Sequence, residues 1–163
     1  MNSSVSVTLD QSDLHTITTV AAVEGSSDRL WLNGKEEKIN KRGVTVLKEI
    51  RKLAGDRVDP STGEVLVRKA DWGKYGVHIS SMNTFPTGAG LASSAAGLAC
   101  LVYALAQLFS VKETFEGQLS TIARQGSGSA SRSLYGGFVR WQKGVKSDGS
   151  DSIAVQVTRP SYL

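Results

Sequence analysis

The chain has 163 residues, a length that suits one domain of ordinary size. With 40% hydrophobic residues, 21% charged residues and 3 prolines, its composition excludes collagen-like and intrinsically disordered chains. A single cysteine excludes a disulfide framework and a multi-cysteine zinc site, and two histidines disfavour a histidine-built metal site. The formal net charge of +4 is unevenly spread, because the 37 residues between Lys74 and Lys112 include no Lys, Arg, Asp or Glu.

The first part of the chain has the pattern of a β-sheet. Residues 3–9 alternate between polar and apolar side chains, which predicts a half-buried strand. Residues 16–23 are rich in β-branched side chains, and we expect them to form the partner of that strand. Residues 30–32 followed by Asn33 and Gly34 are typical of a β-hairpin.

The hydrophobic period then changes to that of a helix. Apolar residues recur at helical spacing between positions 44 and 54, with Asn40 as a cap and Gly55 as a stop. The basic residues of this helix are expected to lie largely on its solvent-exposed face: Lys41, Lys48, Arg51 and Lys52. Residues 56–74 have the composition of a polar loop.

Further elements alternate along the rest of the chain. We expect a strand over 76–82, a long apolar helix over 91–108 and a second helix over 115–125, followed by short strands near 136–141 and 152–157. Strands come first and helices gather on one side, so the pattern predicts an α+β fold.

The uncharged stretch raises the question of a membrane span. Residues 91–111 have the length of a transmembrane helix. Four polar residues interrupt the segment and no basic cluster flanks it, so a helix buried on all sides in a core is favoured. Residues 1–9 lack the pattern of a signal peptide. We therefore expect no membrane contact and a reducing, cytoplasmic location, consistent with the single Cys100.

Two glycine-rich segments are candidate anion-binding loops. Residues 86–95 (PTGAGLASSA) lead directly into the long helix, where backbone N–H groups and the positive helix end favour phosphate. Residues 126–133 (GSGSASRS) combine glycines and hydroxyls with Arg132, whose guanidinium can grip a carboxylate or phosphate with two hydrogen bonds. Close helix packing for the first loop and a flexible linker for the second are the structural alternatives.

The segments NTFPTGAGLASSAAGLACLVYALAQLF, ARQGSGSASRSLYGGFVRWQKG and DGSDSIAVQV resemble the mevalonate diphosphate decarboxylase family of the GHMP kinase superfamily. The opening NSSVSVTL and the LWLNG hairpin are similar as well, so the resemblance covers nearly the whole chain. It implies an α+β fold of the GHMP-kinase N-terminal type, a two-layer β-α-β arrangement like that of a ribosomal protein domain. The implied activity is the ATP-dependent decarboxylation of mevalonate 5-diphosphate to isopentenyl diphosphate, in isoprenoid and sterol biosynthesis.

The resemblance also implies site residues, by position. For ATP and Mg²⁺ these are Pro86, Gly88, Gly90, Leu91, Ala92, Ser93 and Ser94, with Ser94 facing the phosphates and the metal. For the substrate they are Arg42, Ser127, Gly128, Ser129, Ala130, Ser131 and Arg132. In this scheme Ser94 and Arg132 serve catalysis, Arg132 binding the substrate carboxylate and Arg42 its diphosphate. Homodimers are implied for full-length relatives.

The chain departs from the family pattern in three ways. Ser131 stands where a cysteine is usual, and Gly88 where an alanine is common. Two features of the family have no counterpart: the opening strand with its Lys-Tyr-Trp-Gly-Lys segment, and the later catalytic Asp. Residues 72–74 are similar to part of that segment but lie at a different place in the chain, so we expect Trp72 to be a packing residue. Residues 1–163 are therefore expected to be a partial N-terminal domain, incomplete at both ends, with a sheet edge and an apolar helix face uncovered and no turnover alone.

Other functions remain open at this stage. A related mevalonate-type kinase, or a decarboxylase of the monophosphate, is the nearest alternative within the superfamily. A small nucleic-acid-binding module is the alternative from another class, because residues 41–69 carry 8 basic and 4 acidic side chains. The modest net charge and the lack of an aromatic stacking set argue against nucleic acid as a partner.

Overall fold

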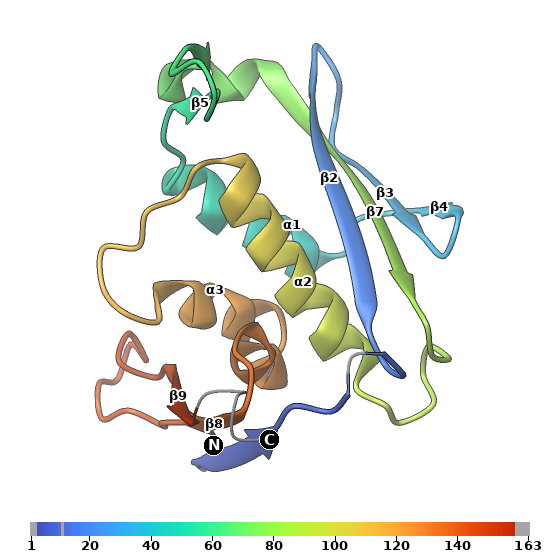
Figure 1. The fold of residues 1–163 in the computed structure, drawn as a ribbon, viewed down its shortest axis with the longest axis vertical. Helices are drawn as coiled ribbons and strands as arrows, with labels where there is room; N and C mark the ends of the chain where they lie inside the picture. The colour runs from blue at the N-terminus through green and yellow to red at the C-terminus, as the bar shows by residue number, and fades with distance from the viewer. Residues whose placement is uncertain (1–2, 11, 159–163) are drawn as a thin grey trace.

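A long antiparallel strand pair lies at one edge of the four-stranded sheet in the computed structural model, which describes residues 3–10 and 12–158 (Figure 1). Strands β2 (Thr16–Glu24) and β7 (Tyr75–Asn83) pair along their whole length. Strand β3 (Arg29–Leu32) lies parallel to β7 on its other side, and β4 (Lys35–Glu37) follows through the Asn33–Gly34 turn. Both turn residues have positive φ, 49° and 80°, so the predicted hairpin is confirmed.

A separate three-stranded sheet has the order β1 (Ser4–Val7), β8 (Phe138–Trp141) and β9 (Ala154–Thr158). The predicted pairing of residues 3–9 with residues 16–23 is therefore wrong, since β1 pairs with β8 and β2 with β7. Strands β1 and β2 therefore belong to different sheets (Figure 1).

The alternation along β1 is present, but its apolar side faces outward. Val5 and Val7 are 62% and 47% exposed, whereas Ser4 and Ser6 are half-buried. The residue pattern predicted the alternation of side chains along this strand. Packing against the rest of the fold decided which face of the strand is buried.

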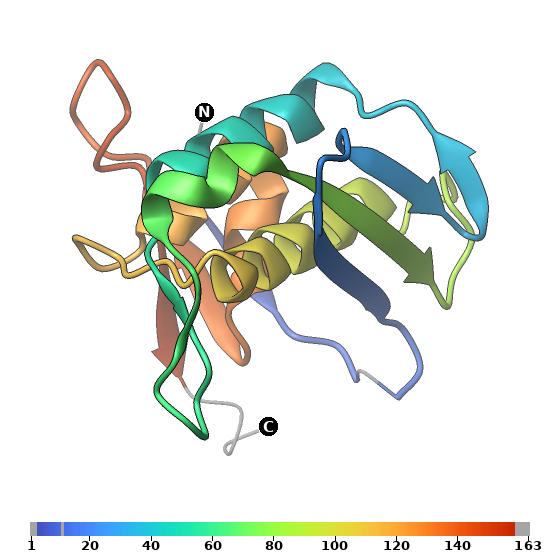
Figure 2. The same cartoon turned by 90° about the horizontal axis from the view of Figure 1, so that it is seen from above.

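Three helices form one packed group beside the strands (Figure 2). Helix α1 (Lys41–Lys52) is capped by the preceding residue, Asn40, as predicted. The Asn40 Oδ1 accepts a hydrogen bond from the Gly43 N–H at 3.0 Å. Helix α2 (Ser93–Leu108) packs on β2 and β7, and α3 (Gln118–Gly126) packs on α1 and α2. The core that they enclose includes Val46, Ile50, Val77, Val102 and Leu105, all fully buried. Among the described residues, no helix is long and apolar enough to cross a bilayer.

The segment expected to be a polar loop over 56–74 has more structure than predicted. It contains the short strands β5 (Arg57–Val58) and β6 (Val65–Val67) and the 3₁₀ helix η1 (Lys69–Lys74). Trp72 is only 4% exposed; its Nε1–H donates to the Gly55 carbonyl at 2.8 Å and its ring meets Phe109 edge-on. The packing role expected for Trp72 is confirmed.

A half-buried ion pair ties α1 to the larger sheet. Asp28 accepts two hydrogen bonds from the Arg51 guanidinium, at 2.8 and 2.6 Å, and one from the Val77 N–H at 2.8 Å. Arg51 was expected with the other basic residues on the solvent-exposed face, but this pairing turns it toward the sheet. The Arg51 hydrogen bonds, together with the Val77 N–H, hold the pKa of the Asp28 carboxyl below its usual value despite partial burial.

We expect Asp28→Asn to lower the free energy of unfolding by about 1–3 kcal/mol at neutral pH, because a charged, multiply bonded acceptor is lost. The carboxyl pKa is lower in the folded chain, so its stabilisation is present above the unfolded value of about 3.9 and is lost as the pH falls through the folded value. Urea unfolding at pH 7 and at pH 3 should therefore show a smaller difference between wild type and variant at the lower pH.

The control is Asp71→Asn, which removes an exposed ion pair with Lys74. This variant should unfold almost like wild type at both pH values. Equal losses for the two variants would contradict the role assigned to Asp28.

Candidate functional site

The first glycine-rich loop ends at the N-terminus of α2 with its backbone exposed. Gly88 and Gly90 both have φ of 78°, and Ala92 has φ of 55° directly before the first helical residue. The Gly88 N–H approaches the Ser93 Oγ at 3.5 Å, and Ser94 is exposed beside it. The first turn of α2 carries no acidic side chain, so the positive helix end can accept an anion without a competing carboxylate.

The second loop follows α3 and forms the 3₁₀ helix η2 (Gly128–Leu134). Its hydroxyls are partly used inside the loop: Ser131 Oγ donates to the Gly128 carbonyl at 2.8 Å, and Ser127 Oγ lies 3.4 Å from Ser129 Oγ. Ala130 and Ser131 are fully buried, so they present no surface to a ligand in this conformation. The substrate contact that the resemblance implies for these two residues stays a prediction; in the structure they pack beneath the loop.

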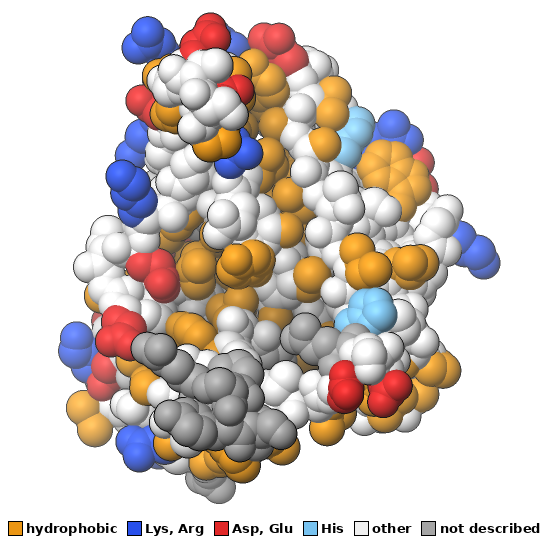
Figure 3. Space-filling model, viewed as in Figure 1, with side chains coloured by type: hydrophobic (Ala, Val, Ile, Leu, Met, Phe, Trp, Pro, Cys, Tyr) orange, Lys and Arg blue, Asp and Glu red, His pale blue; other side chains and the backbone are white. Residues whose placement is uncertain are grey.

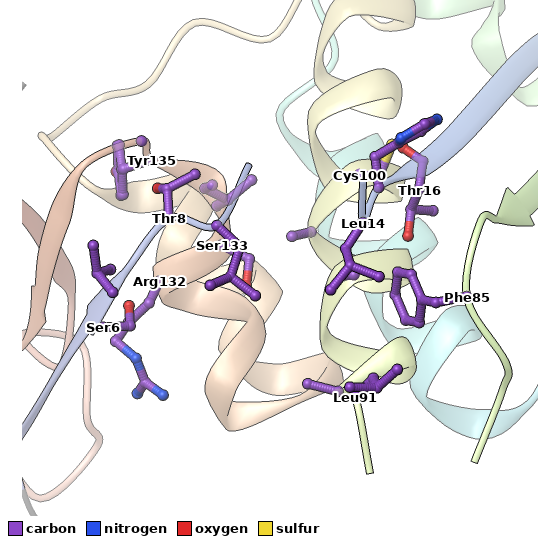
Figure 4. Close-up of a pocket in the computed structure, with 18 of the residues that line it drawn as sticks. Ser6, Thr8, Leu14, Thr16, Phe85, Leu91, Cys100, Arg132, Ser133 and Tyr135 are labelled. Carbon is purple, nitrogen blue, oxygen red and sulfur yellow. The ribbon is translucent and has the colours of Figure 1, made fainter. Parts of the chain in front are cut away.

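A cavity of about 830 Å³ is lined by both loops. Gly90, Leu91 and Ala92 come from the first loop and Arg132 and Ser133 from the second. Figure 4 shows Arg132 on one side of the cavity and Leu91 at the end of the first loop, with apolar side chains opposite. The space-filling view shows apolar side chains gathered in the hollow of this face (Figure 3).

Other predicted site residues lie outside the lining of this cavity. Arg42 is exposed on the first turn of α1, and Ser94 is exposed one residue into α2. Ser127 and Ser129 are half-buried at the start of η2. The structure thus brings parts of the two loops together around one space and leaves Arg42 apart from it.

The charge of the cavity favours an anion. Among the described residues that line it, Arg132 is the sole Lys or Arg, and none is Asp or Glu. Tyr135 also lines it; burial, with the nearby Glu113 and Glu116, raises the pKa of its hydroxyl, which therefore stays protonated and able to donate. The described residues contain no group of three or more His, Cys, Asp or Glu side chains that could hold a metal ion.

The sequence patterns did not indicate which residues form the cavity wall opposite Arg132. Leu14, Phe85, Cys100 and Tyr103 supply apolar surface there, and they come from two loops and one face of α2. Strands β1 and β2, both next to the cavity, are each the last strand of their own sheet. Within residues 3–10 and 12–158, no strand pairs with the outer edge of β1 or β2. The uncovered sheet edge and helix face expected from the sequence stay predictions.

Residues 1–154 match the family model described as the diphosphomevalonate decarboxylase-like N-terminal domain. The chain belongs to this family. It is 53% identical over 159 residues to the diphosphomevalonate decarboxylase of Rattus norvegicus, and the match covers 96% of this chain and 38% of the rat protein. The 163 residues therefore span well under half of the length of such relatives.

Solved structures of the family have the same fold. A 2.3 Å crystal structure of mevalonate 5-diphosphate decarboxylase superposes with a TM-score of 0.80 at 46% identity, covering 98% of this chain and 40% of that one. A structure described as MDDEF in complex with MVAPP, AMPPCP and magnesium superposes with a TM-score of 0.70 at 35% identity, covering 96% and 42% of the two chains. The expected α+β fold and family are confirmed.

We expect Gly90→Ala to destabilise the chain by about 1 kcal/mol, because a Cβ is unfavourable at the left-handed φ of 78°. Gly97→Ala is the matched control in the middle of α2, where a Cβ would meet nothing within 4 Å. That change should stabilise the chain by about 0.5–1 kcal/mol, since alanine favours helix. Thermal or urea unfolding of both variants checks the pair, and effects of equal sign would contradict the assigned loop conformation.

Proposed function

We propose that these residues take part in the ATP-dependent decarboxylation of mevalonate 5-diphosphate to isopentenyl diphosphate, with release of ADP, phosphate and CO₂. The observation that carries the proposal is the cavity between the two glycine-rich loops, which contains Arg132 and no carboxylate among its described lining residues. An MVAPP and AMPPCP complex of a relative at 35% identity supports the same pair of ligands here.

In this proposal the first loop binds the phosphates of ATP. Pro86, Gly88, Gly90, Leu91, Ala92 and Ser93 supply an exposed backbone, and the positive end of α2 stabilises the negative charge. Ser94 is an exposed hydroxyl at this end and would contact the phosphates and Mg²⁺. Hydroxyl and phosphate oxygens suit Mg²⁺, which is usually held by few protein groups together with substrate phosphates. When bound, Mg²⁺ would neutralise phosphate charge.

The second loop binds the substrate in the proposal. Arg132 pairs with the carboxylate, while Ser127, Gly128 and Ser129 border its binding site and Arg42 meets the diphosphate. Phosphorylation of the tertiary hydroxyl makes it a leaving group; the electrons of the bond to the carboxylate then form the alkene as phosphate and CO₂ depart. Positive charge develops at the tertiary carbon during this step, so neighbouring anionic groups of the substrate stabilise it.

The proton of the tertiary hydroxyl must pass to a base. The described lining residues include no Asp or Glu that could accept it. We therefore propose that the 163 residues bind the ligands but do not turn them over without a base from the further length that the relatives possess. A homodimer and a cytoplasmic location remain predictions.

The test is a chimera in which these 163 residues replace the matching 38% of the rat enzyme. The chimera should release phosphate and CO₂ from mevalonate 5-diphosphate in the presence of Mg-ATP, and the 163-residue chain alone should not. Arg132→Lys in the chimera should lower kcat/KM by about 10- to 100-fold, because a lysine cannot replace a two-pronged contact.

Arg140→Lys is the matched control, since Arg140 is exposed on β8 and does not line the cavity. It should leave kcat/KM unchanged. A chimera that folds but shows no turnover would refute the proposed function. An equal loss of kcat/KM for the two lysine variants would refute the proposed role of Arg132.

A further inference from the structure

The indole ring of Trp141 lies against two residues of the second glycine-rich loop, Gly128 and Arg132. Trp141, the last residue of β8, is 8% exposed. A Cβ on Gly128 would lie 3.2 Å from its Cη2 atom, so the ring packs closely under the first residue of η2. The guanidinium carbon of Arg132 lies 5.6 Å from the centre of the same ring, within the range of a cation–π contact.

The ring itself is held in place by a buried hydrogen-bond chain. Its Nε1–H donates to Ser152 Oγ at 3.1 Å, and that hydroxyl donates to the Gln142 carbonyl at 3.2 Å. Ser152 is only 4% exposed, so the indole N–H has a fixed partner. The orientation of the ring is thus set by β8 and by the chain just before β9.

Arg132 is also held by a residue of β1, the strand paired with β8. Ser4 of β1 lies opposite Trp141 of β8, and its Oγ accepts a hydrogen bond from Arg132 Nη1 at 2.8 Å. Arg132 Nε is buried without a hydrogen-bond partner among the described residues. A hydroxyl and an aromatic face therefore hold this guanidinium in position, and none of the ion pairs found among the described residues includes it.

We propose that Trp141 is a positioning residue for Gly128 and Arg132 of the second glycine-rich loop. In this role it strengthens binding of the substrate carboxylate without touching the substrate. The inference rests on the proposed function, in which Arg132 binds the substrate carboxylate. A flat ring fixed by Ser152 keeps the guanidinium oriented before the ligand arrives, which lowers the cost of ordering it on binding.

The kinetic test uses the rat chimera. Trp141→Leu should raise the KM for mevalonate 5-diphosphate by about 10-fold, which corresponds to about 1.4 kcal/mol, and change the KM for ATP by less than about twofold. Trp141→Phe keeps an aromatic face and should retain most of the affinity. In an Arg132→Lys background, Trp141→Leu should cause little further loss, because the group through which it acts has already been changed.

Trp31→Leu is the matched control. Trp31 lies on β3 of the other sheet and makes a similar contact with Arg29, whose guanidinium carbon is 4.7 Å from the ring centre. This variant should leave both KM values unchanged. If Trp141→Leu raises both KM values equally, or if its effect simply adds to that of Arg132→Lys, the ring has only a general structural role and the inference is overturned.

A second measurement on the 163-residue chain is independent of turnover. The Nε–H signal of Arg132 in a ¹⁵N-arginine spectrum, assigned with Arg132→Lys, should move in Trp141→Leu and stay in place in Trp31→Leu, because the ring current of Trp141 is lost. An unmoved signal would overturn the inference. A wild-type chimera without turnover would instead refute the proposed function, while this signal would still test the contact.

Discussion

The burial of α2 is the constraint on which the other parts of the structure depend. The helix has no charged residue, packs against β2 and β7 on one side, and contacts α1, α3 and η2 elsewhere. Val102 and Leu105 on this helix are fully buried, and burial of apolar side chains is the main favourable contribution to folding. Since β7, the first loop and α2 follow one another without a break, burying the strand and the helix fixes the ends of the loop between them.

The placement of α2 also supplies the positive potential that the proposed anion site needs in a loop without lysines. Its N-terminus opens toward solvent, and residues 86–92 of the loop before it are exposed. Backbone N–H groups and the helix dipole provide positive potential without a charged residue. The guanidinium of Arg132 adds a formal charge to the same cavity from the opposite direction, held by Ser4 and Trp141.

Several features could be predicted because they depend on neighbours in the sequence. The Asn40 cap, the turn at Asn33 and Gly34, the apolar helix and the long strand over 75–83 follow from local pattern and lie where they were expected, within a few residues. The partner of β1 could not be predicted in this way, since its register with β8 joins residues more than 130 positions apart. The same holds for Arg51, whose position in a helical pattern indicated solvent while Asp28 turned it toward the sheet.

By itself, the sequence determined the fold class, the family resemblance and the two glycine-rich loops, because these are local patterns of residue type and spacing. Only the tertiary structure decided that Gly90 and Arg132 line one cavity, that Ala130 and Ser131 are buried beneath the second loop, and that Arg42 lies apart. Those outcomes depend on how the sheets and helices pack against one another. Packing is set by contacts between segments that are distant in the sequence. The local residue pattern of a segment therefore does not identify the surface that the segment will contact.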